Sequence, residues 1–353
     1  MGAPGNTNIV VIDDDPNVLG VLDSILNSRG WQAHSFLDST IAVTFIEKNP
    51  PDLILLDISM PGISGYQLCE HLKSRGFNTP IIFLSGLDEA DDKIRGFQAG
   101  GVDYITKPFH HLELLARIDV HLNLRSMSET IQLQKTVEKN ILEISKAQHA
   151  TIFALAKLAE HRDEDTGAHL ENVQEYCRQL AEYLKKNSSY SEQFTPDFID
   201  CLYHAATLHD IGKVAMPDAI LLKQGKLTPE EFDIMKSHTV IGASNMQTVY
   251  NSYPDNAFVG MGIEIALYHH ERWDGSGYPD GLSGLNIPLS ARIMALADVY
   301  DALCSDRCYR KALEHEHVMA MIARESGRQF DAEIVAAFLA LEANFQQIRN
   351  LNK

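Results

Sequence analysis

The C-terminal half of the chain carries histidines and acids at spacings that suit metal-dependent chemistry. Five of the fifteen histidines in the whole chain occur in or beside acid-containing short motifs of this half. These motifs supply His169, His209, Asp210, His238, His269, His270 and Asp298. Imidazole and carboxylate together suit Zn, Mn and Fe better than Mg²⁺. Because these imidazoles and carboxylates are too many ligands for one ion, we expect two ions that share a bridging carboxylate.

A pair of ions about 3.5–4 Å apart is a known means of cleaving phosphate esters, because it lowers the pKa of a shared water and holds the attacking and leaving oxygens. The adjacent His269 and His270 also restrict the local structure. Neighbouring side chains on a helix point about 100° apart. Both can serve one cluster only at a helix end, and the Gly- and Pro-rich segment that starts at Asp274 supplies that end.

A second reactive group lies in the first 120 or so residues. Asp13, Asp14 and Asp57 follow apolar runs that we interpret as strands, so they are expected at one edge of a sheet. Three neighbouring carboxylates repel one another, and Mg²⁺, which prefers oxygen ligands, would relieve this repulsion. Asp57 could then act as a carboxylate nucleophile towards a phosphoryl group. Lys107 could pair with that group, and the Ser85 hydroxyl could move towards it.

The elements that must position these residues follow three patterns. Residues 1–121 alternate apolar runs with amphipathic stretches, which predicts a doubly wound, flavodoxin-like parallel α/β sheet. Residues 151–353 are predicted to be all-helical, apart from the loop after His270 and the connection VAMPDAILLKQGKLTPEE. Residues 122–150 contain neither Gly nor Pro, and their apolar residues recur at three- and four-residue steps. They predict a long signalling helix that pairs with a second copy, or alternatively a monomeric helix packed on its own domain.

Composition excludes several classes of function. The formal net charge of −18 argues against DNA binding, which needs a basic face. No apolar run approaches the length of a membrane span, and the start lacks a signal peptide, so a cytoplasmic location is expected. The five scattered cysteines form no C-x-x-C pair and are interpreted as reduced structural thiols.

Residues 1 to about 121 resemble the receiver domain of two-component response regulators, through VIDDDP, LLDISMPGISG, LSG and DYITKPF. The resemblance implies that Asp57 is the phosphoacceptor and that Asp13 and Asp14 share its Mg²⁺ site. It also implies a sensor histidine kinase as partner. The switch residues that it implies are Ser85, Tyr104 and Lys107.

The segment from about His161 to Arg310 resembles the HD-GYP family of cyclic di-GMP phosphodiesterases, a branch of the HD phosphohydrolases. The matching motifs are RDEDTGAH, LHDIGK, HTVIGA, HHERWDGSGYPDGL, ARIMALADVYDAL and DRCYR. The resemblance implies the metal ligands His169, His209, Asp210, His238, His269, His270 and Asp298, with Asp210 as the bridge. It implies that Lys213 contacts the substrate phosphate near the metals. Arg307 and Arg310 would hold the far phosphate or a guanine edge, and Asp301 would support a ligand.

Two departures from the family pattern bear on these roles. Many members have Glu where this chain has Asp165, and that acid helps to hold a third ion in some of them. Because Asp is one methylene shorter, we expect two ions, with Asp165 as a further candidate ligand. The RPY motif of the family reads RCY here, so the fixed φ of proline is lost between Arg307 and Arg310. Fe or Mn is expected at the site, with Zn or Ni as alternatives.

The expected protein is therefore a response regulator that hydrolyses cyclic di-GMP to pGpG, and further to GMP, under control of Asp57 phosphorylation. The expected assembly is a homodimer through residues 122–150. One alternative keeps the metal site but prefers pGpG or another cyclic dinucleotide. Another is a weakly catalytic module that acts by binding a partner protein, for which the loop at Gly277-Tyr278-Pro279 offers a surface. The C-terminal part lacks a basic recognition helix, which argues against a transcription factor.

Overall fold

The computed structural model describes residues 7–86, 90–160, 162, 168–305 and 311–351. Three residues singled out from the sequence, Asp165, Arg307 and Arg310, lie outside this described part. The chain divides into two compact units, Met1–Leu142 and Glu143–Lys353. Among the described residues, none of the helices combines the length and apolar content that crossing a membrane requires.

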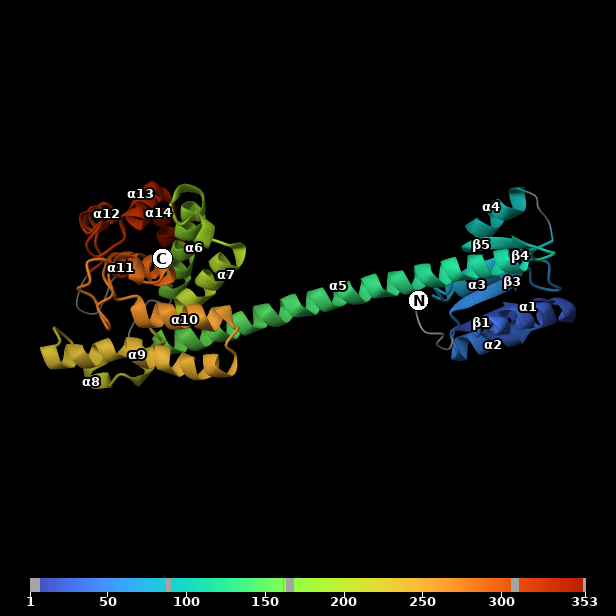
Figure 1. Cartoon of the computed structure of the whole chain (residues 1–353), viewed down its shortest axis with the longest axis horizontal. Coiled ribbons are helices and arrows are strands. Elements are labelled where there is room, and N and C mark those ends of the chain that lie inside the picture. Colours follow the sequence, from blue (N-terminus) through green and yellow to red (C-terminus); the bar gives the residue numbers. More distant parts are fainter. Residues whose placement is uncertain (1–6, 87–89, 161, 163–167, 306–310, 352–353) are drawn as a thin grey trace. The chain divides into compact units, whose positions relative to one another are not determined.

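The first unit is built on a parallel sheet of five strands in the order β2-β1-β3-β4-β5 (Figure 1). The strands are β1 (Asn8–Ile12), β2 (Gln32–Phe36), β3 (Leu53–Asp57), β4 (Ile81–Ser85) and β5 (Asp103–Thr106). The helices between them are α1 (Pro16–Ser28), α2 (Ser39–Lys48), α3 (Gly65–Ser74) and α4 (Ala90–Gln98). Every residue of β3 and β4 is buried, as expected where helices cover both faces of a parallel sheet. The prediction of a doubly wound sheet is confirmed.

The strand order changes direction between β1 and β3, and this is where ligands bind in open parallel sheets. Asp13 directly follows β1, and Asp57 is the last residue of β3. Asp15, the third acid of the run, is instead the N-cap of α1, where its carboxylate accepts a hydrogen bond from the Asn17 backbone NH at 2.8 Å. The topology thus separates a capping acid from the acids at the switch point.

A single helix, α5 (His111–Glu160), spans 50 residues and confirms the prediction of a long uninterrupted helix. It begins at His111 rather than near Leu122, because Leu114 and Ile118, in its first turns, are fully buried in the core of the sheet unit. Near its other end, Ala156 and Ala159 are also buried. The last helix of the sheet unit and the predicted signalling helix are therefore one element.

The second unit is helical, as predicted (Figure 1). Its helices are α6 (His169–Asn187), α7 (Pro196–Ala205), α8 (Asp218–Leu221), α9 (Pro229–Ser252), α10 (Ala257–Tyr268), α11 (Leu289–Cys304), α12 (His315–Arg324), α13 (Ala332–Ala340) and α14 (Glu342–Leu351). Short 3₁₀ segments lie at η1 (Ser191–Gln193), η2 (Ala206–Leu208), η3 (Ile211–Ala215) and η4 (Gly284–Asn286). Tyr176 of α6 and Tyr300 of α11 pack edge to face in its core, with ring centroids 5.1 Å apart. The pair fixes the two helices that carry His169 and Asp298.

Candidate metal centre and phosphorylation site

Five segments of the helical unit bring the predicted ligands together. His169 opens α6, His209 and Asp210 lie between η2 and η3, and His238 lies within α9. His269 and His270 directly follow α10, whose last residue is Tyr268, as the adjacent histidines required. Asp298 lies on α11, the fifth segment. Two groups of ligand atoms result, each within 4.8 Å: His169, His209 and Asp298, and separately Asp210, His238, His269 and His270.

Asp210 turns its two carboxylate oxygens towards different histidines. Its Oδ2 lies 3.2 Å from Nε2 of His209, which belongs to the first group. Its Oδ1 lies 3.2 Å from Nε2 of His238 and 3.8 Å from Nε2 of His269, which belong to the second. One carboxylate therefore faces both groups, which is the arrangement that a bridging ligand requires.

Hydrogen bonds at Nδ1 fix which ring nitrogen each histidine presents to the centre. The Nδ1 atoms of His209, His238 and His269 lie 2.9, 2.7 and 2.9 Å from the backbone carbonyls of residues 206, 235 and 265. Donation to a carbonyl places the proton on Nδ1 and leaves the Nε2 lone pair for a metal. Within the described part of the chain, these three buried Nε2 atoms have no hydrogen-bond partner. Buried nitrogens of this kind, facing carboxylates, fit divalent transition metals.

The electrostatics of the second group favour neutral imidazole beside ionised carboxylate. Burial lowers the pKa of His269 to about 4. Burial, together with the neighbouring His269 and His238, lowers the pKa of His270 well below its ordinary value. Burial alone would raise the pKa of Asp210, but Lys213 and His209 outweigh it, so that this pKa lies well below the ordinary range. These are the protonation states that metal binding needs.

The candidate metal centre includes a close backbone approach at Gly212, two residues after Asp210. A Cβ atom at this position would lie 1.9 Å from the carbonyl oxygen of His238 in α9. Only glycine permits that contact. The absence of a side chain at Gly212 is thus what lets Asp210 reach His238.

Asp301 supports the first group, as the sequence suggested. Its Oδ2 lies 2.7 Å from Nδ1 of His169, and its Oδ1 accepts a hydrogen bond from the side-chain amide of Asn172 at 3.0 Å. Asp301 is 1% exposed, so this contact is shielded from water. A carboxylate in this position orients the imidazole and increases its basicity. Asn172 was not foreseen, because its role depends on the packing of α6 against α11.

Lys213 lies beside the candidate bridge, with its Nζ 2.8 Å from Oδ2 of Asp210. The segment that carries Lys213 is held by Arg162, which follows the end of α5. The guanidinium of Arg162 donates hydrogen bonds to the carbonyls of Lys213 at 3.2 Å, of Val214, and of Met216 at 3.0 Å. It also contacts the carboxylate of Asp218 at 2.5 Å. Arg162 opens the motif RDEDTGAH, but its role was not predicted, because its partners are about fifty residues away.

The loop at Gly277-Tyr278-Pro279 folds back on the second group. The Tyr278 ring packs against the His270 ring, with centroids 4.8 Å apart and planes 32° apart. A Cβ atom at Gly277 would lie 2.4 Å from the backbone nitrogen of Arg272, so glycine is needed for this approach. Tyr278 therefore lies beside a candidate ligand.

In the sheet unit, Asp13, Asp14 and Asp57 place carboxylate oxygens within 4.8 Å of one another. Nζ of Lys107 lies 2.6 Å from Oδ2 of Asp13 and 2.7 Å from Oδ1 of Asp57. Burial raises the pKa of Asp57, which is 4% exposed, and Lys107 opposes that rise. The geometry fits Mg²⁺, a hard cation bound by oxygen ligands. Lys107 stands where it can contact an added phosphoryl group.

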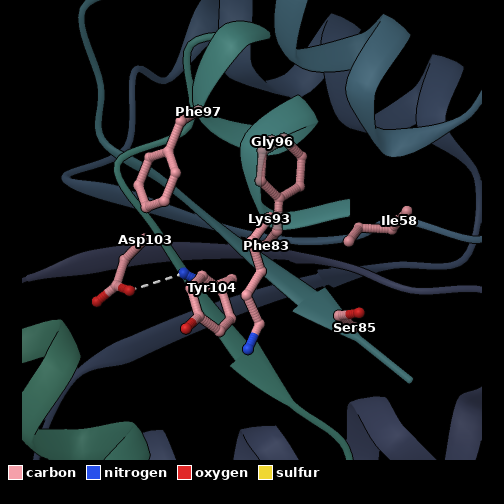
Figure 2. A pocket seen from close by; sticks show the side chains of 8 residues that line it. All are labelled: Ile58, Phe83, Ser85, Lys93, Gly96, Phe97, Asp103 and Tyr104. Atoms are coloured by element: carbon pink, nitrogen blue, oxygen red, sulfur yellow. Dashed lines mark hydrogen bonds between the residues drawn. The ribbon is translucent and has the colours of Figure 1, made fainter. Parts of the chain in front are cut away.

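Tyr104 lies in a small pocket that also contains Ser85 (Figure 2). Its ring lies next to Lys93 of α4, whose Nζ is 4.5 Å from the ring centroid. Phe97 packs edge to face against it, with centroids 6.3 Å apart. The guanidinium of Arg117, on α5, lies 5.8 Å from the same ring. A movement of the Tyr104 ring would therefore change its contacts with both α4 and α5.

Comparison with known proteins shows the class to which this protein belongs. A family model described as "HD domain" matches residues 154–334, and a "Response regulator receiver domain" model matches residues 9–119. The chain belongs to the HD domain family and carries an N-terminal response regulator receiver domain. Divalent metal binding is a property of this family, and the two His/Asp groups lie within the matched range.

Two relatives are similar over nearly the whole chain, and a third is similar over little more than half of it. A "Probable cyclic di-GMP phosphodiesterase" of Vibrio cholerae is 41% identical over 96% of this chain and 79% of its own. The "Cyclic di-GMP phosphodiesterase response regulator RpfG" of Xanthomonas campestris is 36% identical over 97% of this chain and 89% of its own. A "3'3'-cGAMP-specific phosphodiesterase 2" of Vibrio cholerae is 35% identical over 59% of this chain and 38% of its own.

Proposed function

We propose that this protein is a response regulator whose HD domain hydrolyses cyclic di-GMP in a metal-dependent reaction. The observation that carries the proposal is the position of Asp210 between two groups of imidazole and carboxylate ligands. Relatives with the same two domains bear the name of this activity. The products are pGpG and, with a second cleavage, GMP.

The first ion would be held by His169, His209, Asp298 and Asp210, and the second by Asp210, His238, His269 and His270. Two divalent ions supply Lewis acidity when bound, because they polarise a phosphate oxygen and lower the pKa of a nearby water. The imidazole-rich donor set favours Fe or Mn and accepts Zn or Ni. Asp165, just outside the described residues, remains a further candidate ligand.

Lys213 is proposed to bind and orient the scissile phosphate. Its ammonium group is held beside Asp210 by the 2.8 Å contact, and Arg162 fixes its backbone. A point charge at this position stabilises the negative charge that builds up on a phosphate during attack. Arg307 and Arg310, outside the described residues, are proposed to hold the far phosphate or a guanine edge.

Phosphorylation of Asp57 by a sensor kinase is proposed to control this activity, with Mg²⁺ at Asp13, Asp14 and Asp57. Ser85, Lys107 and Tyr104 would register the added phosphoryl group, and α5 would carry the change onwards. The six apolar residues that predicted a paired helix are all exposed: Leu124, Met127, Ile131, Val137, Ile141 and Ile144. Pairing with the α5 of a second copy would bury them, so a homodimer is proposed.

The alternative function is hydrolysis of a different dinucleotide. It is favoured by the similarity to a 3'3'-cGAMP-specific phosphodiesterase and by the fact that metals and Lys213 contact only phosphates. Turnover of cyclic di-GMP, pGpG and 3'3'-cGAMP on one anaerobically purified, metal-loaded sample decides between them. We expect cyclic di-GMP to be cleaved with the largest kcat/KM. A larger kcat/KM for pGpG or for 3'3'-cGAMP would establish the alternative. Absence of turnover of all three nucleotides would refute the proposed enzymatic activity.

A further inference from the structure

The Gly- and Pro-rich loop that follows α10 is bonded to the connection between α12 and α13, which we call the α12–α13 turn (residues 325–331). The backbone NH of Trp273 donates a hydrogen bond to the carbonyl oxygen of Gln329 at 3.0 Å. The NH of the next residue, Asp274, donates to the carbonyl oxygen of Arg328 at 2.8 Å. Two consecutive residues of the loop are thus tied to two consecutive residues of the turn.

The side chain of Arg272 adds a third link between the loop and the turn. Its Nε donates to the hydroxyl of Ser276 at 3.0 Å, within the loop, and its Nη2 donates to Oε2 of Glu325 at 3.1 Å. Glu325 is the first residue after α12, and its carbonyl oxygen accepts the backbone NH groups of residues 328–330. One guanidinium therefore joins the loop to the residue around which the turn closes.

The other end of the α12–α13 turn is fixed by a buried ion pair. Nη1 of Arg292, on α11, lies 2.6 Å from Oδ2 of Asp331, and the two side chains are 6% and 2% exposed. The guanidinium of Arg292 also lies 5.8 Å from the centroid of the Trp273 ring, within the range of a cation–π contact. Because breaking a buried ion pair is costly, the turn is held firmly against α11, the helix that carries Asp298.

The loop that this turn supports reaches the second group of ligands through two contacts. Gly277 lies directly against the backbone of Arg272, where a Cβ atom would be 2.4 Å from the Arg272 nitrogen. The next residue, Tyr278, packs its ring on the ring of His270, and its NH donates to the His270 carbonyl oxygen at 3.3 Å. A displacement of Arg272 would therefore move the Tyr278 ring away from a candidate ligand.

We propose that Arg272 is a positioning residue for the ion held by the second group of ligands, and that the α12–α13 turn acts on this ion through Arg272. This inference rests on the proposed metal-dependent function. Arg272 acts through the Tyr278 ring, so its removal loosens the His270 imidazole and leaves the first group in place. An imidazole whose orientation is less restricted binds a metal more weakly, because the groups around a ligand contribute to metal affinity.

The test is a double-mutant cycle on the full-length protein loaded with Mn²⁺. Arg272→Ala, Glu325→Gln and the double variant are compared with wild type. The control is Arg324→Ala, which removes an exposed arginine from the last turn of α12. The number of bound ions and the rate at which each is released to excess chelator are measured.

We expect Arg272→Ala and Glu325→Gln each to release one of the two ions about two- to fivefold faster than wild type, the size of effect that a half-exposed ion pair supports. Arg324→Ala should match wild type. The double variant should match Arg272→Ala, since both changes break the same contact. Release of both ions at an equally increased rate, release of neither at an increased rate, or simple addition of the two single effects would each overturn the proposal.

Tryptophan emission gives a second measurement, which needs no metal. Trp273 adjoins Arg272, and Trp31, the other tryptophan of the chain, contributes equally to every variant. We expect the emission of metal-free Arg272→Ala to differ from that of wild type and of Arg324→Ala, and an identical spectrum would overturn the anchoring role. If wild type binds no ion, the proposed function fails, whereas the emission still decides whether Arg272 anchors the loop.

Circular dichroism of each variant establishes that it is folded. If Arg272→Ala unfolds, Glu325→Gln carries the test, because it breaks the same ion pair from the side of the turn. Release rates identical to wild type in Glu325→Gln would then overturn the proposal.

Discussion

Nδ1 of His169 and Oδ2 of Asp301 lie 2.7 Å apart in the core of the helical unit, between the first residue of α6 and the last turns of α11. The contact is nearly inaccessible to water, since His169 is 5% and Asp301 1% exposed. It sets which nitrogen of His169 faces Asp298. A residue with no atom in either ligand group thereby controls one of the ligands.

Replacing Asp301 by Asn should weaken metal binding without emptying both positions. The amide can still contact the ring, but it carries no charge to increase the basicity of Nε2. We expect metal affinity to fall about 10- to 100-fold. Competition with a calibrated chelator measures this metal affinity. Asp331→Asn is not a suitable control, because Asp331 forms a buried ion pair with Arg292. Unchanged affinity would show that the hydrogen bond is only structural.

The position of Asp210 predicts different losses from two single substitutions. His238→Ala removes a ligand from one group, so it should lower the affinity for one ion. Asp210→Asn changes the carboxylate that faces both groups and should lower the affinity for both ions. Metal analysis after dialysis against a weak chelator gives the stoichiometry of each variant. Retention of one tightly bound ion by Asp210→Asn would contradict a bridging role.

Arg162 should affect the substrate more than the metals. Its guanidinium holds the carbonyls of the segment that carries Lys213. Arg162→Ala should lower kcat/KM about tenfold or more while metal content stays at the wild-type level, because misplacement of a positioning group is costly. Arg162→Lys should recover little, since a single ammonium cannot reach several carbonyls at once. An equal loss of metal in Arg162→Ala would place its effect at the ligands instead.

Tyr278 should matter through its ring rather than through its hydroxyl. Tyr278→Phe keeps the ring that packs on His270, so metal content and release should match wild type. Tyr278→Ala removes that packing, and we expect the ion at His270 to be released several-fold faster. His269→Ala, which deletes a candidate ligand, should reduce metal content directly. Loss of metal in Tyr278→Phe would show that the phenol oxygen participates.

The metal-free protein should lose stability as the pH falls from about 6.5 towards 4. The folded-state pKa of His269 is about 4, and that of His270 is also well below its ordinary value. Unfolded imidazoles take up protons near pH 6.5. The unfolded state therefore binds more protons in this window, and the free energy of unfolding decreases on acidification. The raised pKa of His209 acts in the opposite direction. Urea unfolding of metal-free wild type and His269→Gln should give a steeper pH dependence for wild type, and identical slopes would refute the assignment.

Much of this protein was determined by local sequence. Apolar runs ending in acids predicted the parallel strands and placed Asp13 and Asp57 at one edge, because side chains at the ends of adjacent strands must be neighbours. The absence of Gly and Pro predicted the long helix, since nothing within it interrupts the backbone hydrogen bonds. The adjacent His269 and His270 required a helix end, and α10 ends at Tyr268.

Tertiary structure decided what depends on contacts between distant segments. No spacing rule relates Arg272 to Glu325, or Arg162 to the carbonyls of residues 213–216. The two carboxylate oxygens of Asp210 face different ligand groups only because η3 and α9 approach each other closely at Gly212. The kinds of ligand follow from the sequence, because a motif carries its own side chains. Packing fixed their orientation, because each imidazole is aimed by a hydrogen bond to a backbone or carboxylate group that folding brings to it.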